Sequence, residues 1–196
     1  MSPRPDVSAE RKPQILQAAL YVFLRKGFTA ARMVDIARKA KLSVGNLYRY
    51  FDSKLDITLA LMELFLSPSL QALEDLLSLP GTVRERLTNA FIDELAAQDK
   101  AAFTLYSEMY HLSRREKRIH KLLSAYNLRL QQQISALLQQ GMERGELRPI
   151  DPASAAFTFQ VIFDGMMQNL PLQPVDSDLA LIVRSAFDQL FEGFET

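Results

Sequence analysis

The spacing of apolar residues constrains this chain more than any other feature. Apolar side chains recur every three to four residues along nearly the whole length, and no segment alternates with period two for long enough to form a strand. The longest uninterrupted pattern runs from about residue 114 to residue 144 and is expected to end at Gly145. The sequence therefore predicts an all-α fold of about nine helices in total.

Prolines, glycines and capping residues divide this pattern into separate helices. A first helix is predicted with Pro13 in its opening turn and Gly27 as a left-handed cap at its end. Ser43 is expected to cap a third helix through its hydroxyl. Ser67-Pro68 is expected to kink or end a fourth helix, and residues 79–82 form a clear break after it.

The last two predicted helices are unusually apolar. They run from about residue 151 to residue 169 and from about residue 176 to residue 192, with Pro171 and Pro174 between them. A helix that is apolar on more than one stripe needs neighbours on more than one side. A second subunit is the expected neighbour, so the sequence predicts a homodimer that forms through its last two helices.

Composition excludes several kinds of chemistry. The chain has no cysteine, which removes disulfides, thiol nucleophiles and thiolate metal sites, and its two histidines are too few for a histidine-rich metal site. No glycine-rich phosphate loop is present, and nothing points to a catalytic triad. We therefore expect no catalytic residue, no metal and no cofactor. Without a run of about 18 apolar residues or a signal-peptide pattern, the chain is expected in the cytoplasm and away from the membrane.

Charge is distributed unevenly although the formal net charge is zero. Residues 1–60 contain eleven Lys/Arg and five Asp/Glu, which gives a net charge of +6, so the remaining residues carry −6. A basic end on an acidic remainder suits an anionic partner such as nucleic acid.

Residues 36–54, within this basic end, read as two short helices that meet at a tight turn. A duplex major groove admits one α-helix, whose N-terminal side chains read base edges while flanking groups hold phosphates. In the second helix Asn46 suits a base edge, Arg49 a guanine or a phosphate, and Tyr48 a phosphate. Double-stranded DNA is the predicted partner, and the candidate contacts are Lys12, Arg32, Met33, Lys41, Ser43, Val44, Gly45, Asn46, Tyr48, Arg49, Tyr50 and Lys54.

The spacing alone leaves a second interpretation open, which is a helical hairpin whose basic face is simply solvated. Val44, Leu47 and Phe51 are expected to point inward, and Tyr50 also suits a core position. Lys54, which follows Ser53 at the start of the next helix, is expected to add a second phosphate site.

A wider set of residues resembles the DNA-binding domain of the TetR family of bacterial transcriptional regulators. The resemblance spans about residues 12–60, with a weaker echo at residues 141–156. It is carried by Ile15-Leu16-Gln17-Ala18-Ala19, Phe23, Gly27-Phe28, Asp35-Ile36-Ala37, Ala40, Ser43, Gly45, Leu47-Tyr48-Arg49-Tyr50-Phe51 and Lys54-Leu55.

The resemblance implies a helix-turn-helix domain over residues 1–55 and a helical domain over residues 56–196 that binds a ligand and dimerises. Two positions depart from the usual family pattern. Ala31-Arg32 stands where a threonine commonly opens the second helix, which removes a cap worth about 1 kcal/mol. Lys41 stands where the turn usually has glycine, so a residue with a side chain is expected at positive φ.

The second domain contains methionines and aromatic residues that suit a flexible apolar cavity, although each also suits an ordinary core. We expect a largely hydrophobic small-molecule effector there. The candidate ligand-binding residues are Met62, Phe65, Leu66, Phe103, Tyr106, Met109, Tyr110, Tyr126, Phe157, Val161 and Met166.

The predicted function is a TetR-like transcriptional regulator, a ligand-responsive repressor that binds a palindromic operator as a homodimer. The alternative is a DNA-binding protein whose second domain docks a protein partner in place of a small molecule. A small helical enzyme is the remaining rival, and no motif in the sequence supports it.

Overall fold

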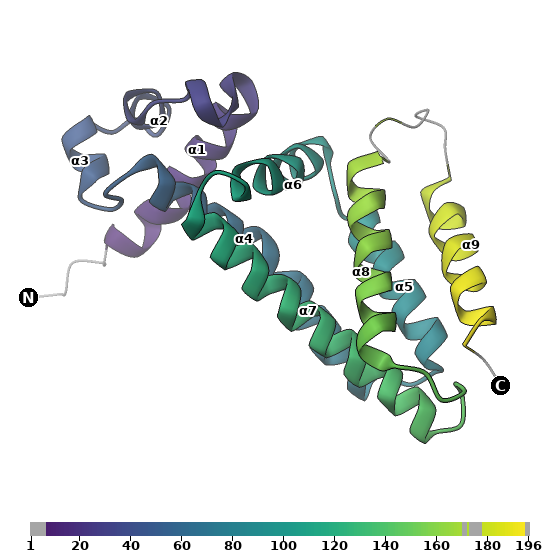
Figure 1. Ribbon diagram of the computed structural model, residues 1–196. Helices are drawn as coiled ribbons and strands as arrows, with labels where there is room; N and C mark the ends of the chain where they lie inside the picture. Colours follow the sequence, from purple (N-terminus) through teal and green to yellow (C-terminus); the bar gives the residue numbers. More distant parts are fainter. Residues whose placement is uncertain (1–6, 170–171, 173–177, 195–196) are drawn as a thin grey trace, which may run out of the picture. The chain divides into compact units, whose positions relative to one another are not determined.

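The computed structural model describes residues 7–169, 172 and 178–194, and all the regular structure in these ranges is helical, which confirms the all-α prediction (Figure 1). Pro171, Pro174 and the predicted helix start at residue 176 lie outside the described residues. The elements within them are α1 (Val7–Ala30), α2 (Met33–Lys39), α3 (Val44–Tyr48), α4 (Lys54–Asp75), the 3-10 turn η1 (Leu76–Ser78), α5 (Val83–Ala96), α6 (Lys100–Ser113), α7 (Lys117–Glu143), α8 (Pro152–Asn169) and α9 (Leu179–Glu192).

The chain divides into two compact units, Met1–Phe65 and Leu66–Thr196, which are called the head and the body below. The division falls inside α4, ten residues after the domain boundary at residue 55 that the family resemblance implied. The two units are described separately.

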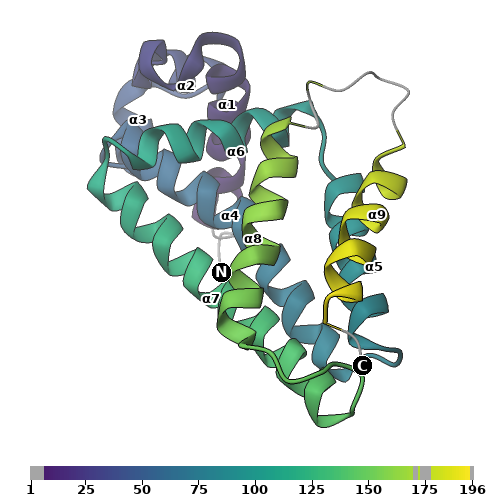
Figure 2. The ribbon, with the colours of Figure 1, turned by 45° about the vertical axis from the view of Figure 1, so that its right-hand side comes forward.

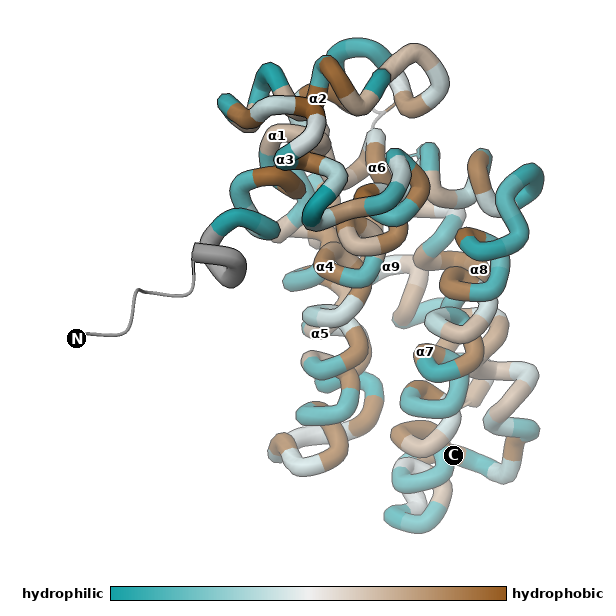
Figure 3. Tube along the Cα trace, turned by 90° about the vertical axis from the view of Figure 1, so that its left-hand side faces the viewer, coloured by the Kyte–Doolittle hydropathy of each residue, from teal (hydrophilic) through white to brown (hydrophobic). Residues whose placement is uncertain are grey.

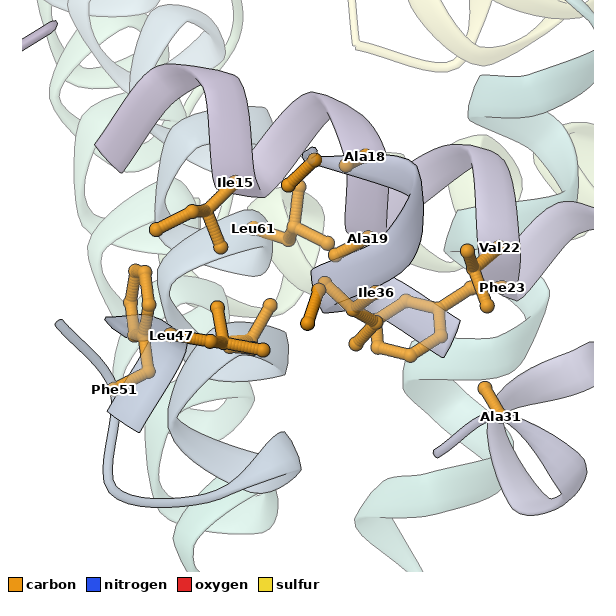
Figure 4. Packing of buried hydrophobic residues seen from close by; sticks show 13 residues of the cluster. Ile15, Ala18, Ala19, Val22, Phe23, Ala31, Ile36, Leu47, Phe51 and Leu61 are labelled. Atoms are coloured by element: carbon orange, nitrogen blue, oxygen red, sulfur yellow. The ribbon is translucent and has the colours of Figure 1, made fainter. Parts of the chain in front are cut away.

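A single apolar cluster holds the head together. α1 packs on α2 and α2 on α3, and Figure 4 shows Ile15, Leu47 and Phe51 close together beside α1. Ile15, Ile36 and Leu47 are fully buried. The other buried members are Ala18, Ala19, Val22, Phe23, Ala31, Ala37, Ala40, Phe51, Ile57 and Leu61.

Two helix boundaries differ from those that the sequence predicted. α1 begins at Val7, so Pro13 lies inside the helix and not in its opening turn. α4 continues through Pro68 to Asp75 because Leu66 and Leu73, on either side of the proline, are both buried and hold the helix to the body core. At Gly27 the backbone leaves helical geometry with φ 74° and ψ 158°, so this residue does take a positive φ, but the chain regains helical structure up to Ala30.

The body is built from helices that each bury one side. α8 runs along α7 and α9 along α5, as Figures 1 and 2 show from two directions. In Figure 3 hydrophobic and hydrophilic residues alternate along each helix, as expected for helices with one buried face. Aromatic rings form the centre of this packing: Phe91 lies 4.8 Å from Phe187 and 5.2 Å from Phe163, measured between ring centroids, and Phe159 lies 5.1 Å from Phe187.

A buried arginine ties the helices together at the η1 end of the body. Arg86 is 4% exposed, and its guanidinium donates to the Leu76 carbonyl and to the Gln140 side-chain oxygen, both at 2.6 Å. These bonds tie α5 to η1 and α7, and the Leu76 carbonyl, which also accepts the backbone N–H of Leu79 at 3.3 Å, gains a charged donor.

We predict that Arg86→Lys lowers the free energy of unfolding by about 1–3 kcal/mol, because one ammonium cannot reach both acceptors in the guanidinium geometry. Urea unfolding followed by circular dichroism measures the change. Arg129→Lys, on the exposed side of α7, is the matched control and should leave stability unchanged. An equal midpoint for wild type and Arg86→Lys would contradict this role.

Candidate functional site

The turn between α2 and α3 presents a short helix at the surface of the head. Lys41 in this turn has φ 55°, the positive value that its place in the sequence led us to expect. An L-residue in this left-handed region costs about 1–2 kcal/mol, so the surrounding packing must hold the turn. The Ser43 hydroxyl accepts the backbone N–H of Asn46 at 3.1 Å and caps α3.

Packing fixes which side of α3 faces outward. Leu47 is fully buried, and Val44 packs partly against the same core. The side of this five-residue helix opposite Leu47 is exposed. Gly45, Tyr48 and Arg49 lie on the exposed side, and Asn46 is half-buried beside them.

Nothing within the head requires a glycine at position 45. A Cβ placed on it would meet no atom within 4 Å, and its φ is not positive. Its lack of a side chain therefore leaves open space at the surface of α3, where another molecule can approach the backbone closely.

A buried carboxylate organises the cations beside α2. Asp35 is 4% exposed and accepts from Lys26 Nζ at 2.8 Å, Arg38 Nη2 at 2.8 Å and the Arg32 backbone N–H at 3.2 Å. The hydrogen bond from Lys26, followed by the bond and charge at Arg32, lowers the pKa of Asp35. Because the Asp35 carboxylate caps the N–H of Arg32, the start of α2 keeps half of a capping box despite its missing threonine.

Lys54 is engaged inside the head. Its ammonium donates to the backbone carbonyls of Phe28, Thr29 (3.2 Å) and Ala31 (2.8 Å), and it lies 4.4 Å from the centre of the Phe28 ring. Burial lowers the pKa of Lys54. Three acceptors use the three ammonium hydrogens, so in this structure the side chain ties the end of α1 to the start of α4. The phosphate contact expected at Lys54 stays a prediction, and it would require the ammonium to leave these carbonyls.

The body contains a small cavity between α4, α5, α7 and α8. Centres of water-sized molecules can occupy about 40 Å³ of it, enough for about three waters. Ala72 on its rim is exposed, so the cavity reaches the surface of the body. Its lining residues are Ser69, Ala72, Leu73, Ala90, Phe91, Glu94, Tyr126, Leu130 and Phe163.

Glu94 is the one acidic group that lines this cavity. Its Oε1 accepts the Ser69 hydroxyl at 3.0 Å and the Gln98 amide at 2.7 Å. Burial raises the pKa of Glu94, and the bond from Ser69 opposes that rise. The charged form of this carboxyl is therefore costly unless a further partner compensates it.

A second interior carboxylate, Asp164 on α8, is already satisfied. It accepts the hydroxyls of Tyr106 and Tyr110, the latter at 2.8 Å, and the Gln160 amide at 3.3 Å. Burial and the nearby carboxylate raise the pKa of Tyr106, and burial raises that of Tyr110 to about 12. Both phenols stay protonated as donors, so this cluster fastens α6 to α8.

Comparisons with known proteins identify the chain. Residues 15–61 match the model of bacterial regulatory proteins of the tetR family, and residues 83–192 match that of the BetI-type transcriptional repressor C-terminal domain. The HTH-type transcriptional regulator YfiR of Bacillus subtilis is 30% identical over 177 residues, covering 86% of this chain and 85% of the relative. The chain belongs to the TetR family. It is a DNA-binding transcriptional regulator and not an enzyme.

Solved structures of TetR-family and related regulators share the fold. A transcriptional regulator from Saccharomonospora viridis in complex with choline superposes with a TM-score of 0.80 at 20% identity, covering 96% of this chain and 99% of that one. FadR from Bacillus subtilis in complex with stearoyl-CoA gives a TM-score of 0.78 at 21% identity, covering 92% and 98%. At these identities the likeness establishes the fold of this TetR-family chain alone.

Ten of the twelve predicted DNA-contact residues of this TetR-family head fall into two groups, apart from the half-buried Asn46 and from Lys54, whose ammonium is engaged within the head. Met33, Val44 and Tyr50 are half-buried and pack against the head core, which limits what they offer to a partner. Exposed side chains belong to Lys12, Arg32, Lys41, Ser43, Tyr48 and Arg49, with Gly45 exposed among them.

The predicted ligand-binding residues are more scattered. Tyr126 lines the cavity, whereas Tyr106 and Tyr110 bind Asp164; Leu66 and Met109 are buried, and Phe103 and Met166 half-buried. Met62 and Phe65 belong to the head. Phe157 and Val161 are 55% and 49% exposed on the outer side of α8 and do not line this cavity, so a ligand contact at these two residues stays a prediction.

Sequence reasoning missed Phe91, Glu94 and Phe163. Phe91 and Glu94 are three residues apart and so share one side of α5. This spacing is the sequence signal that could have placed the two side chains at one site. Within the residues that the structure describes, no cluster of three metal-ligating side chains occurs and no helix is long and apolar enough to cross a membrane.

We predict that Lys54→Met destabilises the head by about 1–3 kcal/mol, because the three carbonyls lose their donor. Urea unfolding measures this loss, and Lys121→Met on the exposed side of α7 is the control. The slope of log affinity for DNA against log salt should not change in Lys54→Met. A slope reduced by about one would confirm Lys54 as a phosphate contact.

The stabilisation that Asp35 provides should depend on pH. Its folded pKa is lowered, so the stabilisation is present above the pKa of the unfolded state and disappears as pH falls through the folded pKa. Asp35→Asn should therefore lower the melting temperature at pH 7, and the difference from wild type should shrink steadily below pH about 4. Asp93→Asn, on the exposed side of α5, is the control and should leave the melting temperature at pH 7 unchanged.

Proposed function

We propose that this TetR-family protein is a homodimeric repressor that reads a palindromic operator through α3 and releases it when a small molecule binds the body. The observation that carries the proposal is the exposed side of α3, where Asn46, Tyr48 and Arg49 surround the open space at Gly45. In this proposal the protein acts in the cytoplasm.

Each proposed contact on α3 has a distinct chemical role. The Asn46 amide both donates and accepts and so suits a base edge, while the Arg49 guanidinium matches a guanine or a phosphate with two parallel bonds. Tyr48 is 49% exposed, and its hydroxyl suits a phosphate oxygen. Lys12, Arg32 and Lys41 are exposed cations of the head that suit further phosphate contacts.

A homodimer places two such heads on one duplex. Two-fold symmetric heads fit half-sites in successive major grooves, whose centres are about 34–36 Å apart. Support for a dimer comes from apolar side chains that the last two helices leave exposed, namely Phe157 and Val161 on α8 and Leu181 and Ile182 on α9. A second copy of the chain is the occupant that we propose for these surfaces.

Response to a small molecule is supported by the body cavity and by the two structurally similar regulators that hold choline and stearoyl-CoA. An effector weakens operator binding only if it binds the two states of the dimer unequally, and a tenfold shift requires about 1.4 kcal/mol of discrimination. In this proposal the domain over residues 1–55 binds the operator, and the domain over residues 56–196 binds the small molecule and dimerises.

We predict that Gly45→Ala separates folding from operator binding. Alanine should stabilise the head by about 0.5–1 kcal/mol, because the added Cβ meets no atom and glycine is the poorer helix former. The same methyl group should weaken operator affinity at least about tenfold by keeping the α3 backbone from the groove. Fluorescence anisotropy with a duplex selected from random DNA measures the affinity.

Arg49→Ala is the companion variant, expected to weaken operator binding without changing stability. Recovery of no palindrome from the random duplex pool would contradict the proposal, as would a Gly45→Ala protein that binds its operator like wild type.

We predict that Val161→Glu disrupts the dimer, because a carboxylate at a buried apolar interface has no partner. The dimer dissociation constant should rise at least about tenfold, as measured by sedimentation equilibrium. Lys121→Glu, exposed on α7, is the control and should stay dimeric. Monomeric wild-type protein, or a Val161→Glu protein that dimerises like wild type, would exclude this interface.

A further inference from the structure

The chemistry of the body cavity is asymmetric. Its walls contain three aromatic rings, those of Phe91, Tyr126 and Phe163, together with small and aliphatic side chains. Among the described residues that line the cavity, Glu94 is the charged one, and none is a lysine or an arginine. A carboxylate enclosed by aromatic rings is a surrounding that favours positive charge.

Glu94 has capacity for a further partner. Both hydrogen bonds that it receives from the described residues end on Oε1, which leaves Oε2 for another group. Both donors are neutral, since Ser69 contributes a hydroxyl and Gln98 an amide. None of the ion pairs between described residues includes Glu94.

Comparison with Asp164 shows that this arrangement is not general in the body. Asp164 accepts from three donors that use both of its oxygens, so its negative charge is stabilised within the protein. Glu94 lacks this complete set of partners and also lies at a cavity that reaches the surface. A bound ligand can therefore give Glu94 the further stabilising partner that protein side chains give Asp164.

We infer that the effector of this protein is a compact organic cation, whose positively charged head group binds between the Glu94 carboxylate and the rings of Phe91, Tyr126 and Phe163. The inference rests on the proposed small-molecule response and names its ligand class. A methylated ammonium group suits the site because it is compact, apolar on its surface and attracted to the faces of aromatic rings. An acyl chain that ends in a carboxylate does not suit it, since the described residues of the lining offer a carboxylate and no cation.

Three ligands with the same six-carbon chain test the head group: hexyltrimethylammonium, hexan-1-ol and hexanoate. Isothermal titration calorimetry with the full-length protein should show that the cation binds at least about tenfold more tightly than the alcohol or the carboxylate. Glu94→Gln keeps the shape of the side chain and should weaken cation binding at least about tenfold, while the affinity for hexan-1-ol stays the same.

Two further variants complete the test. Asp93→Asn removes the neighbouring, exposed carboxylate of α5 and should bind the cation like wild type. Tyr126→Leu keeps an apolar wall without a ring and should weaken cation binding more than hexan-1-ol binding. Tighter binding of hexanoate or hexan-1-ol, equal cation binding by Glu94→Gln and wild type, or no cation binding up to about 10 mM would each overturn the inference.

Operator binding measured without ligand distinguishes a failure of the cation inference from a failure of the proposed DNA-binding function. Wild type and Glu94→Gln should bind the selected duplex equally, because the cavity lies in the body and the proposed DNA contacts lie in the head. If both bind the duplex but neither binds the cation, the inference fails and DNA recognition stands. If neither binds any duplex, the proposed function itself fails.

Discussion

Burial of Leu47 against the head core is the interaction on which the DNA-reading surface depends. A helix of five residues, such as α3, is not stable by itself in water. The conformational entropy lost in forming its first turn exceeds the free energy gained from the few hydrogen bonds of that turn. Its position follows from Leu47, Ile36 and Ile15, which are fully buried together. Once Leu47 points inward, Tyr48 and Arg49 must point outward. The turn can then tolerate an unfavourable φ at Lys41, since the packing on both sides fixes the backbone.

Charged side chains with limited exposure have complete sets of partners at most positions in this protein and an incomplete set at one. In the head, Asp35 and Lys54 have full sets of partners, and Lys54 joins segments that are distant in sequence. In the body, Asp164 is satisfied by two tyrosines, and Arg86 is satisfied by a carbonyl and an amide. Glu94 has neutral donors on one oxygen and a cavity beside it. Because an uncompensated buried charge is costly, the incomplete case points to a ligand and the complete cases point to structure.

The sequence predicted the helices better than it predicted which groups each side chain contacts. The all-α fold, the cap at Ser43, the positive φ at Lys41 and membership of the TetR family were all expected, because each depends on local spacing or on a compact motif. Pro68 was expected to kink or end α4, but the helix continues to Asp75, with the buried Leu66 and Leu73 on either side of the proline. Lys54 looked like a phosphate contact because it stands in a basic motif, whereas three carbonyls 23 to 26 residues away hold its ammonium.

The sequence by itself determined which stretches are helical and where the reading head lies, because helical periodicity and charge are properties of neighbouring residues. Only the tertiary structure decided which aromatic residues enclose a cavity and which lie outside. Tyr126 and Phe157 are both aromatic residues in apolar helices, yet one lines the cavity and the other is exposed. The same holds for Glu94, whose sequence neighbours do not show that Ser69 and three rings surround it. Packing between helices sets these environments, and packing depends on residues that are far apart in the chain.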